Sequence, residues 1–179
     1  RKTPNHKRSI KAGMSPGTPV FIGEKRLDKV RIDVLEYSEK AVEQRQDVST
    51  DSLLPLPSPE GVTWISVKGV HDAAPITALG KTFGIHLLTL EDIVNTAQRP
   101  KIEEYADYIF IALKTMSYND AEKALEIEHI SLIFGENFVI SFQEGEGDVF
   151  GKIRERILVA KSRVRSMHAD YLAYALMDA

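Results

Sequence analysis

The sequence contains no cysteine among its 179 residues. This absence excludes disulfide frameworks, thiolate nucleophiles and zinc sites built from cysteine. No run approaches the roughly 20 apolar residues of a transmembrane helix, and the N-terminus has no apolar signal-peptide core. We therefore expect the chain as given to be soluble, with a length that suits one domain and a core that needs no disulfide or metal.

The common sequence motifs of enzymes are also missing. The histidines show no HExxH spacing, the glycines do not have the spacing of a dinucleotide loop, and there is no P-loop lysine pattern. The sequence therefore does not predict an enzyme. A metal-dependent hydrolase remains an alternative only if His71, His86 or His129 converges with acidic side chains in one pocket.

Charge is unevenly distributed along the chain. Five basic residues and no acid stand among the first eleven positions, which leaves 18 basic and 26 acidic side chains in the rest. We divide the chain into a flexible basic tail over residues 1–17 and an α/β domain over residues 18–179. Affinity for nucleic-acid phosphates rests on positive charge, so the acidic body argues against nucleic-acid binding and leaves room for a surface that binds cations.

The periodicity of apolar residues predicts strands early and in the middle of the chain, with helices between and after them. Expected strands cover residues 18–22, 30–37, 62–67, 108–116, 125–134 and 138–142. Expected helices cover residues 38–46, 74–83, 148–164 and 168–179, and a proline-rich loop covers 53–61. This order predicts a layered α/β domain with a mixed sheet, in which the last three strands form an antiparallel meander.

The segment over residues 85–114 joins a helix, a break and a strand without a spacer. Thr89 is predicted to cap the helix, with Glu91 and Asp92 in its first turn. Pro100 prevents the helix from continuing and biases Arg99 toward an extended conformation.

Three acidic residues are candidates for metal binding. Glu91 and Asp92 are adjacent on one helical turn, and Asp178 stands in an otherwise small and apolar helix. Mg²⁺ takes carboxylate oxygens and keeps several waters, so one or two carboxylates can make a site. Acids in a first helical turn also complement the helix dipole, and an acid among apolar neighbours either faces solvent or has a partner. Spacing alone leaves both interpretations open.

Residues 152–165 hold six basic side chains and one acid. Such a segment forms a solvated outer face, or it meets lipid head groups, RNA or an acidic partner. A soluble module that binds RNA or lipid is therefore a further alternative.

The run GIHLLTLEDIVNTAQRPKIEEYADYIFIALK resembles the cytoplasmic N-terminal domain of the CorA family of magnesium transporters. Three other stretches agree with that family in the same order: VTWISVKGVHD, ISLIFGENFVISFQEGEGDVF and IRERI…RVRSMHADYLAYALMDA. The resemblance covers nearly everything from Thr18 to Ala179. It implies a three-layer α-β-α domain with a mixed, partly antiparallel sheet and a C-terminal helix that runs toward a stalk absent from this chain.

The resemblance also implies a function. By this resemblance, the chain is a regulatory, Mg²⁺-sensing domain of a divalent cation channel for Mg²⁺ or Co²⁺. The domain is expected to assemble as a homopentamer on the cytoplasmic side of the cell membrane. Transmembrane helices that this chain lacks would hold it there. Matched residue by residue, the regulatory carboxylates fall on Glu91, Asp92 and Asp178. Mg²⁺ bound to them between subunits would favour the closed pore. A zinc- or cobalt-preferring branch of the family remains an alternative, because selectivity is decided mainly in the absent pore.

Overall fold

A seven-stranded sheet forms the centre of the computed structural model, which describes residues 13–53, 60–120, 123–160 and 162–179. The strands lie in the order β2-β1-β3-β7-β6-β5-β4. Their bounds are β1 (Arg31–Tyr37), β2 (Val42–Arg45), β3 (Val62–Lys68), β4 (Lys101–Glu104), β5 (Ile109–Asn119), β6 (Ala124–Phe134) and β7 (Phe138–Gln143). β3 and β7 pair in parallel, and the other neighbouring strands pair antiparallel. The sheet is therefore mixed, as the sequence predicts.

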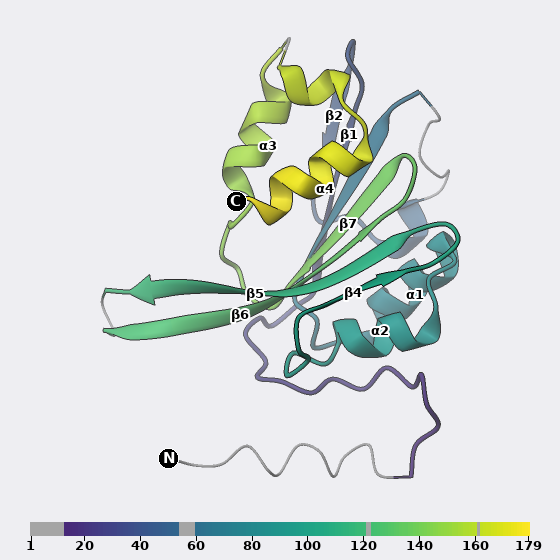
Figure 1. Cartoon of the computed structure of the whole chain (residues 1–179), viewed down its shortest axis with the longest axis vertical. Coiled ribbons are helices and arrows are strands. Elements are labelled where there is room, and N and C mark those ends of the chain that lie inside the picture. The colour runs from purple at the N-terminus through teal and green to yellow at the C-terminus, as the bar shows by residue number, and fades with distance from the viewer. Residues whose placement is uncertain (1–12, 54–59, 121–122, 161) are drawn as a thin grey trace.

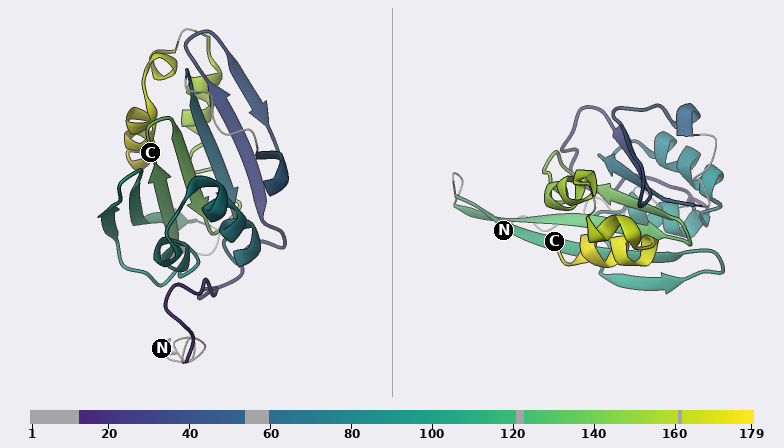
Figure 2. Two further views of the ribbon diagram at one scale, coloured as in Figure 1. Left: turned by 90° about the vertical axis from the view of Figure 1, so that its right-hand side faces the viewer. Right: turned by 90° about the horizontal axis from the view of Figure 1, so that it is seen from above.

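Helices cover both faces of this sheet (Figures 1 and 2). They are α1 (Ala73–Phe83), α2 (Leu87–Ile93), α3 (Gly151–Leu158) and α4 (Ala169–Met177), with 3-10 turns η2 (Thr50–Leu53) and η3 (Arg163–Ser166). One apolar core joins α1 and α2 to the sheet, and a second core joins α3 and α4 to its opposite face. The three-layer α-β-α arrangement is thus confirmed.

The central strand β3 shows why the sequence forms this arrangement. Its first six residues, VTWISV, are all buried, since helices cover both sides of the strand. Trp64 belongs to the core under α3 and α4, and Ile65 belongs to the core under α1 and α2. The indole N–H of Trp64 donates to Ser141 Oγ on β7 at 3.0 Å, so the buried ring has a partner for its one polar group.

Two further predictions are confirmed. β5, β6 and β7 form the expected antiparallel meander. Helix α1 begins after Asp72, whose carboxylate accepts the backbone N–H of Ala74 at 2.9 Å, and it ends at Gly84, which has the left-handed φ of 64° that glycine adopts without strain.

Two predictions for the N-terminal part of the domain are wrong. Residues 18–22 form no strand, and Ile22 makes only an isolated bridge with Asn95. Residues 38–46 form no helix, because the chain turns back on itself and β2 pairs with β1. The Ser38 hydroxyl accepts the Ala41 N–H at 3.2 Å, so the residue predicted to cap a helix closes a hairpin turn.

The predicted helix over residues 148–164 is also wrong in its length. Helix α3 ends at Leu158, and Val159 is extended, with φ −69° and ψ 125°. Ile157 before this break and Val164 after it are nevertheless buried in the same core. The apolar spacing therefore indicated the contacts of these two residues but not the break between them, where Ala160 is exposed.

The structure describes only part of the predicted basic tail and of the predicted proline-rich loop. Residues 1–12 of the predicted tail and residues 54–59 of the predicted loop lie outside the described residues. Gly17, at the end of the predicted tail, is buried, and its N–H donates to the carboxylate of Glu91 at 2.8 Å.

The longest strands, β5 and β6, extend beyond the rest of the sheet as a two-stranded arm (Figure 1). We define the arm as residues 115–118 of β5 and residues 125–128 of β6, which pair with one another in an antiparallel register.

Candidate functional site

Helix α2 carries two of the three predicted metal-binding residues, Glu91 and Asp92. The helix begins earlier than predicted, because the His86 ring, and not Thr89, caps it. His86 Nδ1 accepts the backbone N–H of Leu88 at 3.2 Å. Leu90 and Ile93 are buried in the core, and this burial places the two acids on the outer side of the helix, where both are partly buried.

Thr89 has a different role from the predicted one. It is fully buried, and its hydroxyl donates to the Tyr105 hydroxyl at 3.0 Å and lies 3.2 Å from the Tyr108 hydroxyl. Tyr105 in turn donates to Glu103 at 3.0 Å. These bonds fasten α2 to the segment that follows β4.

Asp92 is held by two neighbours on the same side of the sheet. Lys101 Nζ lies 2.5 Å from Asp92 Oδ2 and 2.7 Å from Glu103 Oε1, and the side-chain amide of Gln98 donates to Asp92 Oδ1. Partial burial disfavours the charged form of Lys101, but its hydrogen bonds and charge attraction to the two carboxylates together raise its pKa. A metal ion at Asp92 must therefore displace the ammonium group of Lys101.

The same lysine acts on Glu103. The hydrogen bond from Lys101 lowers the pKa of Glu103, and the Tyr105 hydroxyl acts in the same direction. Lys101 is not among the site residues predicted from the sequence. The alternation of Lys101, Glu103 and Tyr105, which places their side chains on one face of an extended segment, was the signal for this group.

Asp178 lies far from this group. It directly follows α4, is exposed, and donates its backbone N–H to Tyr174 O at 3.1 Å. Because α2 and α4 cover opposite faces of the sheet, one chain does not bring Asp92 and Asp178 together (Figure 2). Within the described ranges, no three His, Asp or Glu side chains are placed to hold a metal ion.

The oxygen groups at Asp92 and in the turn after α2 nevertheless suit a hard cation. The carboxylate of Asp92 and the amide oxygen of Gln98 are oxygen ligands of the kind that Mg²⁺ accepts alongside water.

His71, His86 and His129 do not converge in the pocket that a metal-dependent hydrolase needs. His86 caps α2, His71 packs edge-on against Phe21, and His129 is buried on β6 beside Ser131. His129 Nε2 lies 3.0 Å from the Ser131 hydroxyl, and its backbone N–H donates to Glu144 at 2.9 Å. These three residues therefore have separate structural surroundings.

Two basic residues of segment 152–165 also have structural roles. Arg154 donates to Asp148 at 2.8 Å and lies over the Trp64 ring, 5.2 Å from its centroid. Arg165 is buried and donates to the backbone carbonyl of Ser38 at 2.9 Å. Neither guanidinium group is thus free to bind an RNA or lipid phosphate without breaking these contacts.

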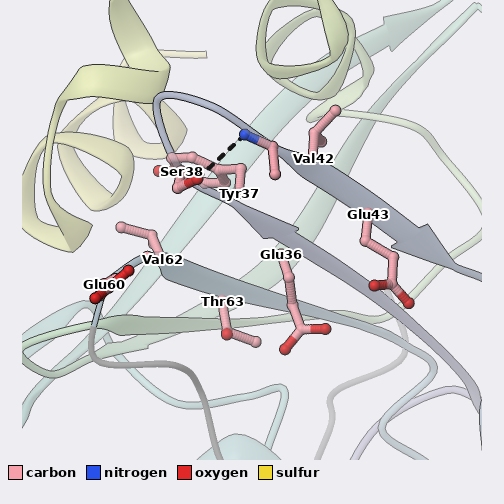
Figure 3. Close-up of a pocket in the computed structure, with 10 residues that line it drawn as sticks. Glu36, Tyr37, Ser38, Val42, Glu43, Glu60, Val62 and Thr63 are labelled. Atoms are coloured by element: carbon pink, nitrogen blue, oxygen red, sulfur yellow. Dashed lines mark hydrogen bonds between the residues drawn. The ribbon is translucent and has the colours of Figure 1, made fainter.

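A pocket of about 400 Å³ lies over the hairpin of β1 and β2 (Figure 3). Glu36 and Glu43 line it from paired positions on the two strands, and Glu60 lines it from the chain before β3. Arg45 lies 3.1 Å from Glu36 and 3.8 Å from Glu43 and so balances part of their charge. Glu36 and Glu43 are not among the predicted site residues, because the helix predicted over residues 38–46 covers the segment where β2 lies.

Comparison with known proteins gives consistent matches. The family model for CorA-like Mg²⁺ transporter proteins matches residues 59–179. The cobalt/magnesium transport protein CorA of Thermotoga maritima is 42% identical over 171 residues, which make up 96% of this chain and 48% of that protein. The chain therefore spans about half the length of this relative.

Solved structures share the fold. The full-length CmaX protein matches with a TM-score of 0.66 at 16% identity, over 87% of this chain and 46% of that one. The soluble domain of CorA from Methanocaldococcus jannaschii matches with a TM-score of 0.58 at 15% identity, over 81% of this chain and 54% of that one. In the part of the chain that the structure describes, every helix is too short or too polar to cross a membrane.

Proposed function

Because the chain belongs to the family of CorA-like Mg²⁺ transporter proteins, we propose that it is the regulatory, Mg²⁺-sensing domain of a divalent cation channel. In this proposal five copies assemble on the cytoplasmic side of the cell membrane, attached to transmembrane helices outside this chain. The transported ion is Mg²⁺, with Co²⁺ as a second substrate, since the Thermotoga maritima relative is named for both. Nucleic acid is not a partner.

One observation carries the proposed mechanism. Asp92 and Asp178 lie on opposite sides of the sheet, so a site that uses both needs two neighbouring copies. The single charge of Lys101 balances only one of the two charges of Asp92 and Glu103, so an aspartate brought close across such an interface is repelled, and a bound cation removes this repulsion. Mg²⁺ then shifts the equilibrium toward the closed arrangement of the subunits. The size of this shift is set by the difference between the affinities of Mg²⁺ for the closed and the open arrangement.

The full-length channel provides the test. Replacing Asp92 and Asp178 together by asparagine should raise the Mg²⁺ concentration that half-inhibits ion flux by roughly tenfold, within the usual range of coupling between two sites. Flux is measured in vesicles loaded with increasing Mg²⁺, and then with Co²⁺. A control double variant, Glu104→Gln with Glu155→Gln, removes one exposed acid of β4 and one of α3 and should behave as wild type. Unchanged Mg²⁺ inhibition in the aspartate variant would disprove the assignment.

Lys101 provides a second test, which uses this chain alone because one or two carboxylates can make a Mg²⁺ site. Lys101→Met removes the ammonium that competes with a metal ion at Asp92 and should tighten Mg²⁺ binding at least about tenfold. A unit charge about 4 Å away is worth about 4 kcal/mol at an effective dielectric constant of about 20. Bound Mg²⁺ stabilises the fold by mass action, so thermal unfolding is followed in chelator and in increasing Mg²⁺.

The expected result has two parts. In chelator, Lys101→Met should unfold at a lower temperature than wild type, because Asp92 and Glu103 lose their shared counter-ion. Added Mg²⁺ should then raise the unfolding temperature of Lys101→Met by more than it raises that of wild type. Lys81→Met, an exposed lysine of α1, serves as the control and should match wild type. An equal response to Mg²⁺ in all three proteins would contradict competition between Lys101 and the ion.

A further inference from the structure

The chain before β1 passes α2 with a tight turn (Figure 1). Residues Ser15-Pro16-Gly17-Thr18 have the order of a type II β-turn, with proline second and glycine third. The Thr18 N–H donates to the Ser15 carbonyl at 3.3 Å, and the Thr18 hydroxyl donates to the same oxygen at 2.8 Å. Gly17 has the positive φ, 82°, that this turn type requires at its third position. The sequence of these four residues therefore specifies the turn.

Gly17 fastens this turn to α2. It is buried, and its N–H donates to Glu91 Oε2 at 2.8 Å. A methyl group added at Gly17 would lie 3.0 Å from Leu87 Cβ, so the backbone approaches the helix more closely than a residue with a side chain could. A hydrogen bond to a carboxylate is charge-assisted and stronger than one between neutral groups. We call residues 15–18 the latch, because they hold Glu91 by this bond and by close packing.

The chain after the latch is anchored without Glu91. The Ile22 N–H donates to the Val94 carbonyl at 2.9 Å, and the Ile22 carbonyl accepts the Thr96 N–H at 2.9 Å. Both partners of Ile22 follow the end of α2. Loss of the bond to Glu91 therefore frees the latch alone, and the anchor at Ile22 keeps the latch close to α2 at a high effective concentration.

The two adjacent acids of α2 are held by different protein groups. Asp92 accepts from Lys101 and from the side-chain amide of Gln98, whereas Glu91 accepts from the backbone of Gly17. A divalent cation at Asp92 would attract the neighbouring Glu91 carboxylate with two full charges, and an amide N–H offers only a partial charge. The cation and the latch therefore compete for the same carboxylate oxygen.

We infer that the latch is a built-in competitor of a cation at α2. Mg²⁺ that binds Glu91 releases the Gly17 N–H, and the docked latch in turn weakens the binding of Mg²⁺. The inference rests on the proposed function, because it takes the acids of α2 as ligands of the ion. It gives the segment before β1 a role in setting the Mg²⁺ concentration at which the domain responds.

The variant Gly17→Ala tests the competition by opening the latch. Alanine is strained at the positive φ of this position, and its methyl group presses on Leu87. With the competitor removed, Gly17→Ala should bind Mg²⁺ about tenfold more tightly than wild type, as expected for the loss of a hydrogen bond to a charged group. The affinity is obtained from thermal unfolding in chelator and in increasing Mg²⁺.

Gly13→Ala is the matched control for this variant. Gly13 also has a positive φ, 90°, but no other group lies within 4 Å of an added methyl group. The change therefore places the same kind of backbone strain in the same segment without touching α2. Gly13→Ala should bind Mg²⁺ as wild type does.

Hydrogen exchange of the wild-type protein tests the latch without relying on a variant that has to fold. The Gly17 amide exchanges with solvent when its bond to Glu91 opens. Saturating Mg²⁺ should speed this exchange at least about tenfold, and in chelator Glu91→Ala should speed it by a similar factor. The Ile22 amide is the internal reference and should exchange at the same rate throughout, because its bond to Val94 is kept.

The outcomes separate this inference from the proposed function. Tighter Mg²⁺ binding by Gly17→Ala together with faster Gly17 exchange in Mg²⁺ supports both. Equal Mg²⁺ affinities of Gly17→Ala and Gly13→Ala, or Gly17 exchange that does not increase in Mg²⁺, overturn the latch. If Mg²⁺ still raises the unfolding temperature of these proteins, the proposed function stands without the latch. No response to Mg²⁺ in unfolding or in exchange overturns the latch and also counts against the proposed Mg²⁺ site.

Discussion

Replacing Leu90 by alanine is expected to lower the free energy of unfolding by about 3 kcal/mol, within the usual range for a buried leucine. Leu90 is 1% exposed and joins α2 to the core, where it packs against Gly80 of α1. The loss leaves a cavity between the two helices. Urea denaturation followed by circular dichroism measures the change.

Gly80 makes this prediction more specific. A methyl group added at Gly80 would overlap with the Leu90 side chain, so Gly80→Ala should by itself destabilise the fold by roughly 1 kcal/mol, despite the better helix propensity of alanine. In the Leu90→Ala background the same methyl group enters the cavity and should be stabilising. The sign of the Gly80→Ala effect thus reverses between the two backgrounds. Additive effects of the two changes would show that the helices do not meet at this point.

Acidification is expected to destabilise the protein through His129 by about 3 kcal/mol in total. Burial, with a smaller contribution from the charge of Lys114, lowers the pKa of His129 to about 4 from its ordinary 6.5. The unfolded chain therefore takes up this proton first. Stability is complete above about pH 6.5 and declines as the pH falls toward 4, and the loss levels off below that. Urea denaturation from pH 7.5 to pH 4 measures the decline.

Glu144 complicates this profile, because burial raises the pKa of its carboxyl group, and this shift adds stability as the pH falls. His129→Gln isolates the histidine. Glutamine does not titrate, it retains hydrogen-bonding groups for Ser131, and it leaves Glu144 in place. Between pH 7.5 and pH 4, the free energy of unfolding of wild type should fall by about 3 kcal/mol relative to that of His129→Gln. Parallel profiles for the two proteins would contradict the role of His129.

The central elements of the fold were predictable because their local and tertiary signals agree. Trp64 and its neighbours in β3 form a continuous apolar run that suits only a strand covered on both faces. Gly84 and Pro100 mark the breaks that follow α1 and α2. The errors fall where a tertiary partner decided the structure: Val42 pairs with Tyr37 across a turn, and Val159 is extended between two segments that pack on one core.

The candidate site was predictable only in part. The adjacent acids of α2 were visible in the sequence, but their contacts were not, because Lys101 reaches Asp92 from a different element. The cap of α2 depended on the ring of His86, which is not among the usual capping residues. The distance between Asp92 and Asp178 depended on which faces of the sheet their helices cover, and sequence spacing carries no such information.

The parallel pairing of β3 with β7 has a consequence for how the chain reaches its fold. The two antiparallel groups, β2-β1-β3 and β7-β6-β5-β4, are built from strands close in sequence. The two groups pair through β3 and β7, from Thr63 with Phe138 to Lys68 with Gln143, and β7 is synthesised only after the whole of α1, α2 and the long hairpin. Closing so long a loop costs entropy before its contacts form, so docking of the two groups is the natural slow step of folding.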